Sequence, residues 1–255
     1  MCRFLAYIGV PIFLDSLLIE PASSLVSQSL AAREAKTVVN GDGCGIGWYG
    51  ERQVPGLYRG TLPAWSDANL ASLCLQVRAG LFLAHVRSAT SGEVSMANCH
   101  PFAAGPHLFM HNGQIGGYDR IRRRIEAMIP DAHYGRRRGN SDSEALFLAA
   151  LGHGLDTDPV GAIVQTLEAT LLAMHEAGID KALRFTAVHT DGIRLHAFRW
   201  ASDAHPPSLY WRRMGDGLTL ASEPFGSDQD VWNKVPPGSV MTVGQDVSFA
   251  DLKVG

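Results

Sequence analysis

The order of strand-like and helix-like segments along this 255-residue chain constrains its fold more than any other feature. Short extended segments rich in aromatic and branched residues come first, at residues 4–8, 45–49 and 57–59. Helical periodicity then predominates between residues 118 and 176, and from residue 183 the chain returns to strands. This order predicts an α+β domain in which sheets are covered by helices. No internal repeat or long linker divides the chain, so we expect a single domain over residues 1–255.

The remaining expected elements follow from periodicity and from glycine and proline punctuation. Ser141 and Glu144 form a capping-box pattern that opens one of the helices. Asp191 and Gly192 form a good hairpin signal between two strands. Helices are predicted at residues 67–77, 118–128, 141–151 and 160–176, and further strands at 80–88, 107–112, 184–190, 193–200, 208–212, 218–222 and 240–243.

Composition and charge exclude several classes of protein. A net charge of −3 and a pI near 6.3 do not favour a general binder of nucleic acid or of membrane surfaces. No apolar run approaches the ~18 residues that span a bilayer, and the apolar start is interrupted by Pro11 and Asp15. The four cysteines show neither zinc nor disulfide spacing, which indicates a reducing, cytoplasmic setting. Two arginine clusters, at residues 120–124 and 136–138, are predicted to be solvated surface.

Cys2 follows Met1 directly, and methionine before a small residue is usually removed. Cys2 would then carry its own base, because the freed α-amino group, with a pKa of roughly 8, can accept the thiol proton directly or through one water. The structural alternative is that Cys2 is a small buried hydrophobe.

Three other segments carry groups that would serve such a nucleophile. Arg87 ends an apolar strand, where its planar fork suits a carboxylate, although a structural salt bridge is an alternative. Asn112 and Gly113 offer a side-chain amide and an unobstructed backbone N–H that could stabilise an oxyanion, although they could also form a hairpin turn. Asp142 is not needed for the capping box, so its carboxylate is free to bind an ammonium group.

Taken in this order, these segments resemble the class II glutamine amidotransferases, the N-terminal-nucleophile type, and particularly their stand-alone YafJ-like branch. The resemblance covers most of the chain and implies the N-terminal-nucleophile fold, a four-layer αββα sandwich of two antiparallel sheets. It implies that Cys2 attacks the glutamine side-chain amide, that Asn112 and Gly113 form the oxyanion hole, and that Arg87 and Asp142 bind the α-carboxylate and α-amino group. Thr90 and His100 are implied to line the pocket.

The implied reaction hydrolyses glutamine to glutamate and ammonia through a γ-glutamyl thioester, and it requires no metal or organic cofactor. His107 and His111 have helical zinc spacing but lie in a strand-like run, so no metal site is predicted. The ammonia could pass to an unknown acceptor, such as a separate synthase subunit. Glutamine or another γ-glutamyl compound is thus the expected small-molecule partner, and the sequence indicates no oligomeric state.

The chain also departs from the family pattern. Arg3 stands where better-known members have glycine, and Ser88 and Ser91 stand where some sugar-phosphate members have tryptophan and histidine. These substitutions predict a roomier or differently shaped pocket. Alternative functions are hydrolysis of a γ-glutamyl conjugate, as in ergothioneine-pathway relatives, a choloylglycine-type acylase, and a catalytically silent glutamine-binding regulatory subunit.

Overall fold

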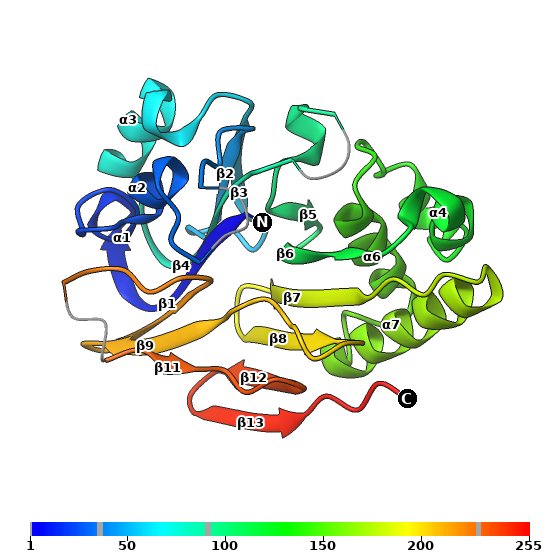
Figure 1. Cartoon of the computed structure of the whole chain (residues 1–255). Helices are drawn as coiled ribbons and strands as arrows, with labels where there is room; N and C mark the ends of the chain where they lie inside the picture. Colours follow the sequence, from blue (N-terminus) through cyan, green and yellow to red (C-terminus); the bar gives the residue numbers. More distant parts are fainter. Residues whose placement is uncertain (1, 35–37, 90–92, 228–230) are drawn as a thin grey trace.

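Two antiparallel sheets form the centre of the protein, as the computed structural model shows (Figure 1). The structure describes residues 2–34, 38–89, 93–227 and 231–255. The first sheet has seven strands, in the spatial order β11 (Asn233–Lys234), β9 (Tyr210–Met214), β10 (Gly217–Ala221), β1 (Arg3–Phe13), β4 (Arg78–Val86), β2 (Cys44–Trp48) and β3 (Gly56–Gly60). The second has six, in the order β13 (Val247–Asp251), β12 (Ser239–Val243), β8 (Leu195–Ala201), β7 (Leu183–Thr190), β6 (His107–Ile115) and β5 (Phe102–Ala104).

Helices cover the outer face of each sheet, on opposite sides of the molecule (Figure 1). The first sheet carries α1 (Asp15–Leu18), α2 (Leu25–Leu30) and α3 (Ala68–Gln76), and the second carries α4 (Tyr118–Glu126), α6 (Asp142–Gly152) and α7 (Pro159–Glu176), with the short α5 (Asp131–Tyr134) beside α6. Each helical layer shares an apolar cluster with its sheet. A third cluster lies between the sheets and includes Phe4, Leu83, Met110 and Val188. The three clusters define four layers, αββα, as the sequence predicted.

Strand alternation determines which side chains face the space between the sheets. Phe4 of β1 and Met110 of β6 belong to the central cluster, whereas Leu5 and Phe109 belong to the outer ones. Because side chains alternate with a period of two, even-numbered positions of β6, and of β1 as far as the register shift after Ile8, point inward. Asn112, in the second half of β6, therefore faces the first sheet.

Most predicted elements are confirmed, and the differences lie at their limits. β1 runs on to Phe13, well past the predicted end, and the short elements α1, α2, α5, β5, β11 and β13 were not predicted. The hairpin at Asp191 and Gly192 is confirmed, since β7 ends at Thr190 and β8 starts at Leu195. Within the described ranges, no helix is both long and apolar enough to cross a membrane.

Candidate active site

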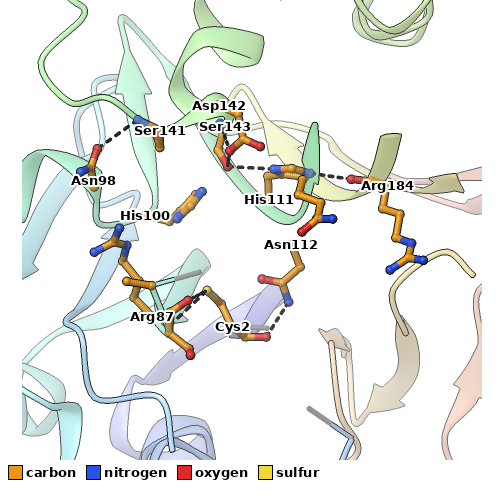
Figure 2. Close-up of a pocket in the computed structure, with 14 residues that line it drawn as sticks. Cys2, Arg87, Asn98, His100, His111, Asn112, Ser141, Asp142, Ser143 and Arg184 are labelled. Atoms are coloured by element: carbon orange, nitrogen blue, oxygen red, sulfur yellow. Dashed lines mark hydrogen bonds between the residues drawn. The ribbon is translucent and has the colours of Figure 1, made fainter. Parts of the chain in front are cut away.

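A single cavity brings together residues that are far apart in the sequence (Figure 2). Its wall includes six of the residues singled out from the sequence: Cys2, Arg87, His100, Asn112, Gly113 and Asp142. Thr90, the seventh, and Ser91 lie outside the described residues. The cavity lies where β1 begins and β4 ends, beside the second half of β6 and the first turn of α6, so both sheets contribute to it.

Cys2 precedes β1, the central strand of the first sheet, and its thiol forms hydrogen bonds with the backbone of Ser88. Sγ accepts a hydrogen bond from the Ser88 N–H at 3.3 Å and donates one to the Ser88 carbonyl at 3.4 Å. Burial raises the pKa of the Cys2 thiol, while the Ser88 hydrogen bond and the charges of Arg87 and Arg3 act in the opposite direction. Because burial is the largest of these causes, the thiol is protonated at neutral pH and needs a base before it can attack.

Asn112 connects the two sheets at Cys2. Its Nδ2 donates a hydrogen bond to the Cys2 carbonyl at 2.9 Å, and an amide nitrogen carries a second N–H for another acceptor. Its Oδ1 is buried, and the interaction of the Asn112 side chain with His85 raises the pKa of that histidine, against the larger effect of burial. Asn112 and Gly113 lie within strand β6, so the hairpin-turn alternative is wrong.

Gly113 lies against the backbone of β7, and this close approach explains its residue type. A Cβ at position 113 would overlap the Arg184 carbonyl oxygen and the ring of His111. The same Arg184 carbonyl lies 3.2 Å from His111 Nε2, and His111 Nδ1 lies 2.8 Å from the Ser143 hydroxyl. Burial lowers the pKa of His111, although the negative charge of Asp142 acts to raise it. These contacts join the Asn112 segment to β7 and α6.

Arg87 follows the last residue of β4 and lines the cavity although its side chain is almost fully buried. Its backbone is fixed by two hydrogen bonds, from its N–H to the Gly43 carbonyl at 2.8 Å and from the Asp42 N–H to its carbonyl at 3.0 Å. Its Nη1 donates to the Glu93 carbonyl at 3.2 Å. The guanidinium therefore has a fixed position in the cavity wall.

Asp142 is the first residue of α6, and its carboxylate is partly occupied by the backbone. One oxygen accepts the Ile115 N–H at 2.9 Å and the other the Ser143 N–H at 2.8 Å. The Ser143 hydroxyl also donates to Oδ1, at 3.3 Å. A carboxylate has about four acceptor sites, so these three bonds leave capacity for a ligand on the cavity side.

Only half of the predicted capping box forms at α6. Ser141 Oγ accepts the Glu144 N–H at 3.3 Å, but the Glu144 carboxylate accepts the Arg138 and Gly139 N–H groups instead of reaching back to Ser141. The Ser141 N–H donates to Asn98 Oδ1 at 3.2 Å. Glu144 can turn away because Arg137, whose side chain is 7% exposed, pairs with it at 2.8 Å. The prediction of a solvated arginine at position 137 is therefore wrong.

His100 lines the cavity and stacks on His85, with ring centroids 4.3 Å apart. Neither ring nitrogen of His100 has a hydrogen-bond partner among the described residues. Burial lowers the pKa of His100 well below its usual value and that of His85 to about 3, and the positive charge of Arg87 adds to both shifts. Both rings are therefore neutral, and His100 contributes a flat, uncharged wall.

Arg3 is not part of the cavity wall and is buried next to Glu223. Its Nη1 lies 3.5 Å from Glu223 Oε2, and both side chains are almost fully buried. The Glu223 carboxylate also accepts the backbone N–H groups of Arg33 and Glu34 at 2.9 to 3.0 Å. Burial lowers the pKa of Arg3, and Glu223 opposes this shift. The pair thus ties the strand that carries Cys2 to the segment after α2.

Glu223→Gln is expected to lower the free energy of unfolding by about 3 to 5 kcal/mol, because it leaves the buried Arg3 cation without its counter-charge. Urea denaturation measures the change. The matched control is Glu176→Gln, which removes the partner of Arg124 in an ion pair about half exposed on each side. That control should cost at most about 1 kcal/mol. Equal losses in the two variants would contradict the structural role of the buried pair.

The cavity also contains residues that were not predicted as site residues. No sequence pattern had marked them as functional. His111 and Ser143 are neighbours of predicted site residues, and Arg184 lies in strand β7 without a recognisable motif around it. Strand register identifies Arg184, since it lies opposite Gln114, two residues beyond Asn112. Further lining residues are Ser88, Ala89, Asn98, Gln114 and Ser141.

Comparison with known proteins identifies the family. The model of class-II glutamine amidotransferases matches residues 17–205. The chain belongs to the class II glutamine amidotransferases. It is 31% identical to a probable glutamine amidotransferase of Saccharomyces cerevisiae, over 95% of this chain and 82% of the relative. It is 32% identical to a γ-glutamyl-hercynylcysteine sulfoxide hydrolase of Mycolicibacterium smegmatis, over 95% and 96%.

A solved structure also resembles this amidotransferase closely. A glutamine aminotransferase class-II domain protein from Silicibacter pomeroyi superposes with a TM-score of 0.81 at 36% identity, over 99% of both chains. The predicted N-terminal-nucleophile fold is therefore confirmed, and the protein is an enzyme of the amidotransferase and amidohydrolase type. The family match begins at residue 17, so it does not include Cys2.

Proposed function

We propose that this amidotransferase hydrolyses the side-chain amide of glutamine to glutamate and ammonia, with Cys2 as the nucleophile. One observation carries the proposal: Cys2, Asn112, Arg87 and Asp142 line the same cavity (Figure 2). A nucleophile, an oxyanion donor and two groups of opposite charge match the parts of an amino acid whose side chain ends in an amide.

The proposed binding mode fixes the orientation of the substrate. Arg87 holds the α-carboxylate and Asp142 the α-ammonium group, so the side-chain amide points toward Cys2. His100 forms a neutral wall, and Thr90, outside the described residues, is proposed to complete the pocket.

The proposed reaction has two steps. After removal of Met1, the free amine of Cys2 takes the thiol proton, and Sγ bonds to the γ-carbonyl carbon. Asn112 Nδ2 and the Gly113 N–H stabilise the oxyanion, the C–N bond breaks, and the nitrogen leaves as ammonia with the transferred proton. Water then adds to the thioester, the S–C bond breaks, and glutamate is released as the thiol is reprotonated.

The test is an assay of purified protein whose intact mass shows that Met1 has been removed. We expect glutamine to give glutamate and ammonia in equal amounts. The proposal is wrong if the processed protein releases neither product from glutamine. We also propose that residues 1–255 form one type-2 domain and that its ammonia can pass to a separate synthase subunit, which co-purification would identify.

Arg87→Gln is expected to raise KM for glutamine by about 10- to 100-fold, because a charge-assisted pair with the α-carboxylate is lost. Steady-state kinetics measure the change. The matched control is 4-aminobutanamide, which is glutamine without its α-carboxylate, and its KM should be similar in the variant and the unmodified enzyme. A parallel rise in KM for both substrates would show that the variant damages the cavity rather than carboxylate binding.

A second candidate substrate is a γ-glutamyl conjugate, in which a larger amine replaces ammonia. The relative from Mycolicibacterium smegmatis, named as a hydrolase of such a conjugate, supports it. The glutamyl half would occupy the same pocket, so the two candidates differ only in the leaving group.

A further inference from the structure

A second cavity adjoins the proposed active site on the side away from Arg87. It is lined by Glu34, Arg184, Arg199, residues 204–208 and Pro237. Arg184 belongs to the walls of both cavities. In Figure 2, Cys2 and Asn112 lie between Arg87 and Arg184, so the proposed glutamyl-binding end and the second cavity are on opposite sides of the nucleophile.

Strand register places the second cavity along the inner face of the second sheet. Asn112 of β6 pairs with Thr186 of β7, and Thr186 pairs with Arg199 of β8. Neighbouring strands lie about 4.8 Å apart, so the backbone of Arg199 is roughly 10 Å from that of Asn112. This separation matches the length of an amino acid or a short peptide attached to the scissile nitrogen.

Two guanidinium groups face this cavity with incomplete hydrogen bonding. Arg184 binds Asp203 through Nε and Nη2, and Arg199 donates from Nε to the Pro207 carbonyl at 3.0 Å and from Nη1 to the Val235 carbonyl at 2.6 Å. Among the described residues, neither Arg184 Nη1 nor Arg199 Nη2 has a hydrogen-bond partner, and Arg199 has no carboxylate within 4.0 Å.

We infer that this cavity is the leaving-group subsite of the enzyme and that it takes an amine bearing a carboxylate, such as an amino acid or a short peptide. The inference rests on the proposed function of the Cys2 site. The carboxylate would bind between Arg184 and Arg199, whose free N–H groups suit an anion. The Glu34 carboxylate, which accepts a hydrogen bond from the Tyr210 hydroxyl, also lines this cavity and repels anions. The substrate carboxylate would therefore bind away from Glu34.

The reaction balances as it does for glutamine. Cys2 Sγ bonds to the γ-carbonyl carbon, the C–N bond breaks, and the amine leaves with the proton taken from the thiol. Its carboxylate is unchanged throughout, and water then releases glutamate from the thioester. Ammonia, by contrast, would make no use of the second cavity.

The test compares two substrates that differ in one group, γ-glutamylglycine and its neutral analogue γ-glutamylglycinamide. The unmodified enzyme is expected to prefer γ-glutamylglycine by about 10- to 100-fold in kcat/KM, the usual effect of a charge-assisted hydrogen bond. Hydrolysis of glutamine with equal rates for the two conjugates would overturn the subsite alone. Hydrolysis of none of the three would overturn the proposed function and the subsite together.

Variants test which residues bind the carboxylate of the leaving group. Arg184→Met is expected to reduce the preference about tenfold or more, since one guanidinium is lost. The ratio of the two substrates within one variant corrects for any loss of folded enzyme. Asp203→Asn, which removes the carboxylate that Arg184 binds, should keep or increase the preference. Arg123→Met removes an exposed arginine elsewhere and should not change it; an equal loss in this control would overturn the assignment.

Discussion

Cys2→Ser is expected to lower kcat for glutamine hydrolysis by at least about 10⁴-fold, since removal of a nucleophile in a comparable hydrolase costs about 10⁶-fold. Serine is also small, so removal of Met1 should proceed as before and the variant should differ in its nucleophile alone. A hydroxyl is far less acidic than a thiol, so the α-amino group, with a pKa of roughly 8, takes its proton much less readily in a site built around a cysteine. Glutamate release from protein of verified intact mass measures the loss.

The matched control is Cys74→Ser, which changes a fully buried cysteine of α3 in the outer cluster of the first sheet. This variant should lose stability because a hydroxyl replaces a thiol in apolar surroundings, but the folded enzyme should keep its turnover. A Cys2→Ser enzyme with a rate near that of the control would refute the proposed nucleophile.

Asn112→Ala is expected to lower kcat by about 10²- to 10³-fold with a much smaller change in KM, because an oxyanion donor acts mainly in the transition state. The same side chain donates to the Cys2 carbonyl at 2.9 Å, so a positioning effect must be separated from a catalytic one. Alkylation of Cys2 by iodoacetamide makes this separation, because displacement of iodide forms no oxyanion. If Asn112 stabilises the oxyanion, the variant should keep the alkylation rate while it loses amide hydrolysis.

Slower alkylation in proportion to the lost hydrolysis would contradict this role and indicate that Asn112 only orients Cys2. Asn98→Ala offers a further comparison. Asn98 Oδ1 accepts the Asn140 and Ser141 N–H groups at 2.9 and 3.2 Å, and the side chain has no contact with Cys2. Its effect should therefore come through the start of α6 and appear in KM.

The layer order was predictable because it depends on local patterns. Strands and amphipathic helices produce hydrophobic patterns within short windows of sequence, and Asp191 with Gly192 correctly predicted a hairpin. The short helices α1 and α2 were not predictable in the same way, because four to six residues carry too little periodicity. Their formation depends on the sheet they cover.

The convergence of the site residues follows from long-range register, which no local pattern contains. Cys2 directly precedes β1 of the first sheet, and Asn112 lies at an inward-facing position of β6 in the second sheet. The two residues meet because the sheets pack face to face, and the Asn112 side chain then reaches the Cys2 carbonyl. Glu144 departed from the capping box because a buried Arg137 competes for its carboxylate, a tertiary effect. Arg184 could not be predicted as a site residue either, because only the pairing of β7 with β6, which sets Arg184 opposite Gln114, brings it to the cavity.

Chain ends are usually among the most mobile parts of a protein, yet this chain begins in the middle of a sheet. β1 is hydrogen-bonded to β10 on one edge and to β4 on the other, starting from Arg3 opposite Val86. The proposed nucleophile, Cys2, would therefore lose little conformational entropy on attack, because folding has already ordered the strand that follows it. An affinity tag joined to Cys2 would convert its α-amine into an amide and so remove the proposed base, whereas Gly255 is exposed, so a tag for the experiments above belongs at the carboxyl end.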